Sequence, residues 1–438
     1  MLPPGPKTPA FWQTFGFALN PRRYSRRVLA QHGSAVRFLG LNGNGVAVSD
    51  PELARQVFAT DPEKFETPSV LGEVFGIHSV LATSGAPHKR QRKLLNPHFH
   101  SAEVRALATT MKRVIDEHSS ALAGAAARKD VVVMADFAQA LTLDVILETV
   151  FGAGEIDRPE GRDVLRTVIR AVPPVAIFSS FLRTKYFPPW NRFLKARAAF
   201  DAWVDRCVAT RRASGNATGD LLGMLLASRY EDGSEMSGDE IRDLIFALLI
   251  AGHETTAVAI AWGVYFWVRE PACAARLREE LAKLAPGAPP EALARVPYLD
   301  AFVKETMRME PILSDVPRMC REPVTIGKWE IPKGEMIVVN IAALFDDATL
   351  YAEPSRFRPE RFLEKKFGPG EFMPFGGGNR RCLGAAFAEM ELAIALATLT
   401  TSWDLTLADA EPERSVRRNV TMGPARGVRV NVAQRQPR

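Results

Sequence analysis

The stretch Phe375-Gly376-Gly377-Gly378-Asn379-Arg380-Arg381-Cys382-Leu383-Gly384 decides the fold of this 438-residue chain. It places one cysteine at the end of a glycine-rich loop, just before residues 385–399, which are strongly helix-forming. We therefore expect the Cys382 sulfur near a helix N-terminus, where free backbone N–H groups and the helix dipole favour a thiolate. The glycines let the backbone approach something flat or bulky, and the two arginines can meet an anion.

These features together suit axial ligation of heme iron by a thiolate. The other cysteines, Cys207, Cys273 and Cys320, are far apart, and none belongs to a CxxC pair. Without a secretory signal peptide, this usage predicts a reducing cytoplasmic location. A zinc site at His253-Glu254 is disfavoured because Ala257 stands where an HExxH motif needs its second histidine.

Composition places the chain among globular proteins, with 47% hydrophobic and 24% charged residues. The net charge of +6 is compatible with acidic partners, but no aromatic-interleaved basic stripe or nucleic-acid module is present. No run approaches the roughly 20 uninterrupted apolar residues that a membrane span needs. We therefore expect a soluble protein with no membrane anchor and no nucleic-acid partner.

Hydrophobic patterning predicts a mainly α protein with small sheets. The strongest helix begins after Ser237, where Glu240 completes a capping box, and it ends near Arg269 before Glu270-Pro271. Residues 244–250 are apolar on all sides, so this helix is expected to be buried. Another helix is expected over residues 297–309. Strands are expected at residues 35–39 and 46–49, joined by a turn with Asn-Gly, at 324–326 and 336–340, and in the last ~25 residues.

The buried helix contains Ala251-Gly252-His253-Glu254-Thr255-Thr256. Ala251 and Thr255 lie four residues apart and share a face, which leaves room for a small ligand beside a hydroxyl. Glu254 can relay protons, and a buried charge next to a helical glycine indicates a functional reason. By itself the motif is equally compatible with a kinked helix and a solvated carboxylate.

Two further groups are weaker when taken alone. Glu305 and Arg308 share a helix face, and Arg361 is a third partner if the pair is buried. His88 and Arg92 lie four apart and can clamp one anion, although a solvated basic face is the ordinary interpretation.

Taken together and in order, these motifs resemble those of the cytochrome P450 family over nearly the whole chain. Residues 375–384 match the family's cysteine loop F-x-x-G-x-R-x-C-x-G, and residues 251–256 match its oxygen-activating helix motif. Residues 305–308 match E-x-x-R, and residues 359–362 match the P-E-R-F segment. The resemblance implies a single P450 domain over 1–438, with a long central helix over a heme, opposite the cysteine loop. A β-rich part would span about 30–60 and 312–345 with the C-terminal strands, and a helical body about 85–310 and 382–400.

The resemblance also implies a heme b cofactor with Cys382 as the iron ligand. Arg380, Arg92, His88 and Arg318 would bind the heme propionates, although many family members have tryptophan where His88 stands. Phe375 would pack near the sulfur, and Gly376, Gly384 and Ala251 would also lie against the cofactor. Glu305, Arg308 and Arg361 would form a structural network that supports the cysteine loop.

The implied reaction inserts one oxygen atom from O₂ into a hydrophobic substrate, with Thr255 holding oxygen and Glu254 in the proton path. Electrons would come from a separate ferredoxin or flavodoxin with its reductase, docking at Lys89, Arg90, Lys93 and Arg381. The substrate pocket would include Leu248, Ala251, Leu313, Val316 and Thr421. A fatty acid ranks first, before a terpenoid or steroid, although Asp315 near the pocket would disfavour a carboxylate.

Three alternatives remain from the residues alone. A peroxide-dependent or isomerising heme-thiolate enzyme is opposed by the Glu254-Thr255 pair, which suits O₂ activation. A non-catalytic heme-binding protein would not need these proton-delivery groups. A heme-free helical binding protein would keep Cys382 as a core residue.

Overall fold

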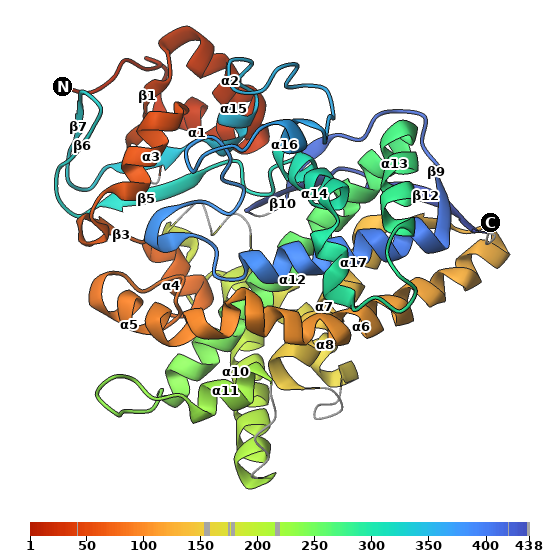
Figure 1. Cartoon of the computed structure of the whole chain (residues 1–438). Coiled ribbons are helices and arrows are strands. Elements are labelled where there is room, and N and C mark those ends of the chain that lie inside the picture. Colours follow the sequence, from red (N-terminus) through yellow and green to blue (C-terminus); the bar gives the residue numbers. More distant parts are fainter. Residues whose placement is uncertain are drawn as a thin grey trace.

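The computed structural model describes residues 1–41, 43–152, 158–173, 176, 180–214, 220–418 and 420–435. The chain is mainly helical with small sheets, as the sequence predicted (Figure 1). The helices are α1 Ala10–Leu19, α2 Pro21–His32, α3 Pro51–Ala59, α4 Ser69–Phe75, α5 Gly85–Leu95, α6 Ser101–Arg128, α7 Met134–Phe151, α8 Arg158–Ala171, α10 Pro188–Ser214, α11 Leu221–Ala227, α12 Gly238–Arg269, α13 Pro271–Ala282, α14 Pro297–Met309, α15 Ile341–Phe345, α16 Arg361–Glu364 and α17 Ala385–Ser402. The strands are β1 Ala35–Phe38, β2 Gly45–Val48, β3 Phe65–Glu66, β4 Val131–Val133, β5 Val316–Cys320, β6 Val324–Ile326, β7 Trp329–Ile331, β8 Met336–Val339, β9 Trp403–Leu407, β10 Ser415–Arg418, β11 Thr421–Pro424 and β12 Arg429–Gln434.

The central helix α12 has the predicted bounds. Its capping box is formed: the Ser237 hydroxyl accepts the Glu240 N–H at 3.2 Å, and the Glu240 carboxylate accepts the Ser237 N–H at 2.8 Å. Helices α7 and α17 pack against α12, so its apolar residues lie in the core. This burial, rather than intrinsic propensity, stabilises so long a helix.

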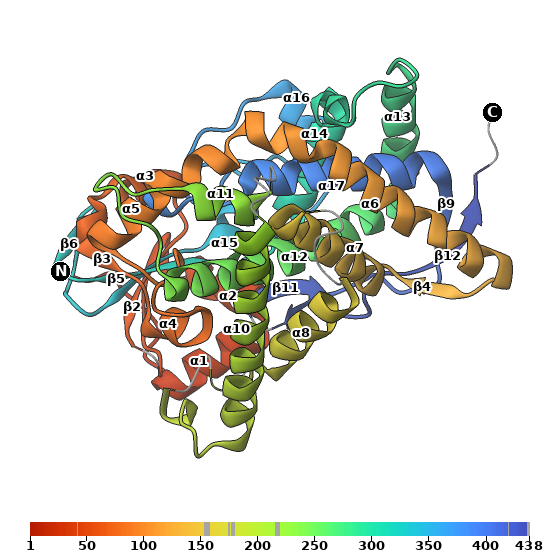
Figure 2. The same cartoon turned by 90° about the horizontal axis from the view of Figure 1, so that it is seen from below.

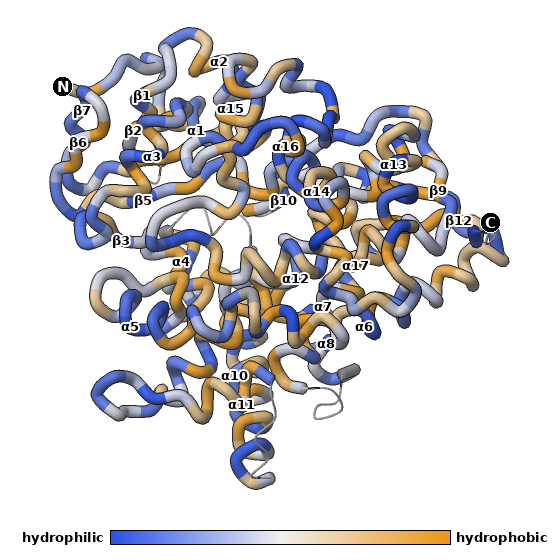
Figure 3. The backbone as a smooth tube through the Cα atoms, in the orientation of Figure 1, coloured by the Kyte–Doolittle hydropathy of each residue, from blue (hydrophilic) through white to orange (hydrophobic). Residues whose placement is uncertain are grey.

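In the described part of the chain, α12 alone is long and apolar enough to cross a membrane by length and composition. However, 67% of its most apolar stretch is buried inside the protein. Figure 3 shows hydrophobic residues gathered where α12, α7 and α17 meet. The helix therefore has the character of a core helix.

The strands form small sheets at the edge of the helical body (Figure 1). The predicted hairpin is confirmed: β1 and β2 pair antiparallel, with Ala35 opposite Val48. The largest sheet has the order β1-β2-β8-β5-β3, and β2 pairs with β8 in parallel. Strands β6 and β8 were both predicted. Strand β6 forms a tight hairpin with β7, whereas β8 pairs with β5 and with the much earlier β2. Local pattern could not assign the pairing of β8 with β2, because the two strands are far apart in sequence.

Two hydrophobic cores follow from this arrangement. The larger unites α6, α7, α12, α14 and α17, and the smaller lies under the five-stranded sheet and includes Val48, Phe65, Ile337 and Phe345. The cysteine loop leads directly into α17, which packs on α12. The two most informative motifs are thereby brought to neighbouring helices.

Candidate active site

The cysteine loop is a tight turn that ends at α17. Gly376 and Gly378 both have φ of +66°, a backbone conformation that favours glycine. The Cys382 N–H donates to the Phe375 carbonyl at 2.9 Å and closes the loop. Helix α17 begins three residues after the cysteine, which confirms the expected helix N-terminus.

The flat group that two of the glycines accommodate is a protein side chain. A Cβ at Gly377 would lie 2.4 Å from the ring of Phe58, and one at Gly378 would lie 2.5 Å from the Phe58 carbonyl oxygen. By contrast, a Cβ at Gly384 would meet nothing within 4 Å. Gly377 and Gly378 therefore fix the loop against α3, whereas Gly384 borders open space.

Cys382 is exposed, although it lies deep among neighbouring groups. Burial raises the pKa of its thiol, and this is the largest influence. The Gly384 N–H, which bonds to the sulfur, and the charges of Arg381 and Arg92 act in the opposite direction and lower the pKa. The loop thus supplies the thiolate-stabilising groups that the sequence predicted, but within a desolvated setting.

Four cationic or titratable side chains predicted to bind one anionic group gather beside this loop. Burial lowers the pKa of His88 to about 3, and Arg380, Arg92 and Arg318 add to the effect. Burial and Arg380 lower the pKa of Arg318 to about 10, and burial and Arg92 lower that of Arg380 to about 10. Such mutual repulsion costs free energy, so the cluster suits a ligand with negative charge.

The hydrogen bonds of these arginines go to neutral oxygens. Arg92 donates to the Arg381 carbonyl at 3.0 Å, and Arg380 donates to the Ser84 hydroxyl at 3.0 Å and to the Thr83 carbonyl. Arg318 donates to the Pro317 carbonyl at 3.0 Å. Within the described residues, no carboxylate forms an ion pair with Arg92, Arg318 or Arg380. Three arginines without a counter-ion fit a group with two carboxylates, such as the heme propionates.

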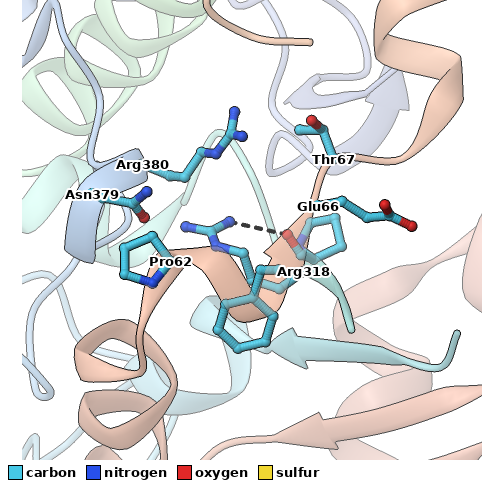
Figure 4. A pocket seen from close by; sticks show the side chains of 8 residues that line it. Pro62, Glu66, Thr67, Arg318, Asn379 and Arg380 are labelled. Carbon is cyan, nitrogen blue, oxygen red and sulfur yellow. Dashed lines mark hydrogen bonds between the residues drawn. The ribbon is translucent and has the colours of Figure 1, made fainter. Parts of the chain in front are cut away.

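A small cavity lies between two of these arginines. Figure 4 shows Arg318 and Arg380 on its wall, reached from β5 and from the cysteine loop, while the Glu66 carboxylate points away from both. The dashed line marks the bond from Arg318 to its neighbouring carbonyl. The cavity therefore gives polar groups access to both guanidinium groups.

Helix α12 presents one less buried stripe in its otherwise buried middle. Leu248 and Thr255 are half-buried, and Ala251 between them is exposed, whereas Leu249, Thr256 and Ala257 are buried. Residues at this spacing share a helix face. The Thr255 hydroxyl donates to the Ala251 carbonyl at 2.7 Å. The structure thus brings Ala251, Thr255 and Leu248 onto one face bordering open space.

Glu254 points toward the C-terminal hairpin β10–β11. Its Oε1 accepts a hydrogen bond from the Thr421 hydroxyl at 3.3 Å, and Thr421 also donates to the Arg418 carbonyl at 2.9 Å. Burial raises the pKa of Glu254, while Thr421 and the Arg418 charge oppose that rise. A half-buried carboxyl whose pKa is raised is a candidate for proton transfer.

The predicted pocket residues differ in exposure. Leu313 is 38% exposed and Val316 half-buried, but Thr421 is only 2% exposed, and its hydroxyl donates to Glu254. Asp315, which the sequence placed near the pocket, accepts a hydrogen bond from Ser314 at 2.5 Å. Burial raises the pKa of Asp315, and the charge of Arg417 partly opposes it.

Comparison with known proteins agrees with this geometry. The sequence profile of the cytochrome P450 family matches residues 3–430. The chain belongs to the cytochrome P450 family. It is 33% identical to cytochrome P450 138 of Mycobacterium tuberculosis, over 99% of this chain and 97% of that protein. It is also 33% identical to cytochrome P450 135B1 of the same species, over 98% of this chain and 91% of that protein.

The solved structures to which the chain is similar are also cytochromes P450. Retinoic acid-bound cyanobacterial CYP120A1 superimposes with a TM-score of 0.87 at 25% identity and covers 99% of both chains. The heme domain of cytochrome P450DA has a TM-score of 0.86 at 23% identity, over 100% of this chain and 98% of that one, and supports the fold. This P450 is therefore a heme-thiolate monooxygenase with heme b as its cofactor, as the sequence predicted.

The predicted trio of this P450 lies together in the core. Glu305 accepts from Arg308 at 2.7 Å and from Arg361 at 3.1 Å, and none of the three is more than 4% exposed. Their other hydrogen bonds also avoid the cysteine loop: the two arginines donate to the carbonyls of Phe345, Ala352 and Arg356 and to the Met309 sulfur, and Glu305 accepts the Arg358 N–H at 2.8 Å. The connection to the loop is indirect, through Tyr351, whose hydroxyl donates to the Glu371 carbonyl at 2.8 Å.

Sequence reasoning missed two contributors to the P450 site. Phe58 lies more than 300 residues before the loop that it packs against, and no local pattern connects the two. Arg418 belongs to a C-terminal strand that was predicted only in outline. His253, which the sequence did not favour as a zinc ligand, is a buried residue whose Nδ1 lies 3.1 Å from the Leu249 carbonyl oxygen.

Proposed function

We propose that Cys382 is the axial ligand of the heme iron in this P450, with His88, Arg92, Arg318 and Arg380 around the propionates. The observation that carries the proposal is the cluster of three arginines without a carboxylate partner in the described structure, next to an exposed cysteine. Bound heme supplies the redox chemistry, and thiolate donation favours O–O cleavage. Phe375, Gly376, Gly384 and Ala251 would lie against the cofactor. The openness at Gly384 and Ala251 supports that placement.

Thr255 and Glu254 are the proposed proton-handling residues. The Thr255 hydroxyl lies on the open stripe of α12 and is anchored to the Ala251 carbonyl, which orients it. Glu254 lies on the adjoining face, where burial raises its pKa and so favours the protonated form more than in water. Protons would therefore pass from the β10–β11 hairpin side through Glu254 to the Thr255 hydroxyl.

The proposed substrate is hydrophobic, because Leu248, Ala251, Leu313 and Val316 offer mainly apolar surface, with Thr421 behind them. Retinoic acid in the CYP120A1 structure is an isoprenoid carboxylate, which supports an apolar acid or terpenoid as the class. Asp315 opposes a carboxylate less than its sequence position indicated, because burial favours its neutral form and Arg417 offsets its charge. Fatty acids, terpenoids and steroids are the classes to screen, by the spin-state shift on binding and by product analysis.

We propose that electrons come from a separate ferredoxin or flavodoxin with its reductase, an acidic carrier that would dock on exposed basic side chains near the cysteine loop. Of the predicted docking residues, Arg90 pairs with Asp232 and Lys93 with Glu231. Lys89 and Arg381 are exposed, so they are the better contacts for an acidic carrier. Charge reversal at Lys89 or Arg381 should slow reduction, more so at low salt, and an unchanged rate would remove this surface from consideration.

We further propose that residues 1–438 act as one P450 domain in the cytoplasm. The decisive experiment for the site is Cys382→Ser, with Cys207→Ser on α10 as the matched control. The carbon monoxide complex of the reduced Cys382→Ser protein should lose the thiolate-type absorption, and the control should retain it. Retention in Cys382→Ser would show that another residue holds the iron. Dependence of turnover on O₂ rather than peroxide would test the reaction class.

A further inference from the structure

Two segments of the chain carry positive charge without any acidic residue. Residues 1–49 contain six lysines and arginines, and residues 164–200 contain seven, yet neither segment has an aspartate or glutamate. The whole chain has 50 acidic residues, so long acid-free segments are not a consequence of composition. Acidic residues from other segments pair with five of these cations, namely Arg22, Arg26, Arg37, Arg183 and Arg197. The positive charge of a surface formed here therefore comes from the other lysines and arginines.

Helix α1, in the first of these segments, exposes its aromatic face to solvent and buries a polar residue. Phe11, Trp12, Phe15 and Leu19 are 54%, 61%, 48% and 66% exposed. At about 100° per residue they fall on one arc of the helix. The polar Gln13 lies on the opposite side, 3% exposed, and donates to the carbonyls of Pro6 and Thr8 while its own carbonyl accepts the Leu39 N–H.

These bonds fix the orientation of α1. Gln13 makes three hydrogen bonds inside the protein, and rotating the helix to bury the rings would break them. Gly16 also packs closely on the ring of Tyr24, where a Cβ would approach to 2.9 Å. The outward aromatic face is therefore imposed by the fold.

A second exposed apolar group belongs to the other acid-free segment. Phe181 is 77% exposed and Tyr186 81% exposed, and the Lys185 ammonium lies 5.3 Å from the Tyr186 ring centre. Leu194 is 41% exposed in the first turns of α10, beside the exposed Arg192 and Lys195. Figure 2 shows α1 and the start of α10 toward the lower edge of the molecule. The two segments that carry these exposed groups thus lie at the same edge in that view.

We propose that this side, formed by α1 and the loop into α10, binds an anionic lipid surface. Aromatic rings and basic side chains together match the headgroup region of a bilayer, where rings bury their apolar bodies and cations meet phosphates. The cations are Lys7, Arg23, Arg27, Lys185, Arg192 and Lys195, all exposed. An acidic protein would match the charge but not the exposed aromatic face of α1, which the headgroup region of a bilayer accommodates.

The proposed lipid-binding surface lies near the strands that contact Glu254. Helix α1 packs on β10, and Arg417 of β10 lies over the Phe17 ring at 5.1 Å. The β10–β11 hairpin also carries the residues that contact Glu254. A lipid surface bound at α1 would therefore lie near the hairpin that borders the proposed substrate pocket.

Flotation of the purified holoenzyme with vesicles tests the proposal. The parent should bind vesicles of phosphatidylglycerol and phosphatidylcholine at low salt, and pure phosphatidylcholine weakly. The double variant Trp12→Ser/Phe15→Ser should bind at least ~tenfold more weakly, because it loses two rings that would be buried in the bilayer. Arg23→Glu/Arg27→Glu should reduce the dependence on anionic lipid. The matched control is Leu363→Ser, a 43% exposed residue of α16 at the opposite edge of Figure 2, which should bind as the parent does.

Heme absorption and the thermal midpoint of each variant confirm that it is folded. The proposal is overturned if the folded parent does not bind anionic vesicles, or if Trp12→Ser/Phe15→Ser binds as well as the parent. An equal loss in Leu363→Ser would also overturn it. A parent dimer that dissociates in the double variant and does not bind vesicles would assign the face to a second copy of the chain instead. None of these outcomes depends on the heme ligand or the substrate.

Discussion

The hydroxyl of Thr421 donates a hydrogen bond to the carboxylate of Glu254, 167 residues earlier in the chain, at 3.3 Å. This bond links the central helix to the C-terminal hairpin. It stabilises the charged form of a carboxyl whose pKa burial raises. The Thr421 hydroxyl shares its proton between Glu254 and the Arg418 carbonyl, and through this bond it opposes the effect of burial on the residue that we place in the proton path.

Replacing Thr421 with valine should raise the pKa of Glu254 further, since the bond that lowers it is lost. The ionisation of Glu254 in the pH profile of turnover should then move to higher pH. Thr421→Ser, which keeps the hydroxyl, should retain the parent profile. Identical profiles for all three proteins would show that this bond does not tune the reaction.

Thr255→Ala should uncouple electron consumption from product formation, because its hydroxyl lies on the open stripe of α12. Product formed per electron pair is the measurement. Thr256→Ala is the control, as this neighbouring hydroxyl is buried and bonded to the Gly252 carbonyl at 3.1 Å. Equal coupling in Thr255→Ala and the parent would contradict the assigned role.

Arg318→Leu should release heme about tenfold faster, because one charge-assisted hydrogen bond to a propionate would be lost. Transfer of heme to apomyoglobin measures the rate. Lys333→Leu, an exposed cation in the turn before β8, should leave the rate unchanged. A parent-like rate in Arg318→Leu would place this arginine outside the propionate site.

Glu305→Ala should destabilise the protein by about 3–5 kcal/mol, because Arg308 and Arg361 would remain buried without their carboxylate. Denaturant unfolding gives the free energy. Glu353→Ala removes an exposed ion pair with Arg356 and should change stability by less than about 1 kcal/mol. Similar losses of unfolding free energy in both variants would mean that the buried trio stabilises the protein no more than an exposed ion pair does.

Glu391 on α17 should make stability depend on pH. Burial alone raises the pKa of this carboxyl, which is 1% exposed, well above its ordinary 4.5. Because the native pKa is raised, its contribution to stability is fully present below the unfolded pKa and is lost as pH rises toward the native one. Glu391→Gln should remove that loss, so the stability difference between the two proteins should grow as pH rises. Unfolding midpoints from pH 5 to 8 check this, with the exposed Glu279→Gln as control.

Short-range pattern predicted the elements whose causes are local. The capping box of Ser237 and Glu240 fixed where α12 begins, and Glu270-Pro271 fixed where it ends, since both act on adjacent backbone groups. The hairpin of β1 and β2 followed from its turn. Strands β3, β4 and β5 were not predicted individually, because each is five residues or fewer and pairs with a strand distant in sequence. The three-residue β7 was also missed, although its partner β6 directly precedes it.

The amino-acid sequence by itself determined the family, the residues available for chemistry and their order, because the spacing within each motif is covalent. Only the tertiary structure decided which of them meet: Phe58 against Gly377, Thr421 against Glu254, and three arginines with no carboxylate partner in the described residues. It also turned the aromatic face of α1 outward, through the buried bonds of Gln13. These contacts depend on packing and desolvation between distant segments, which no local pattern encodes.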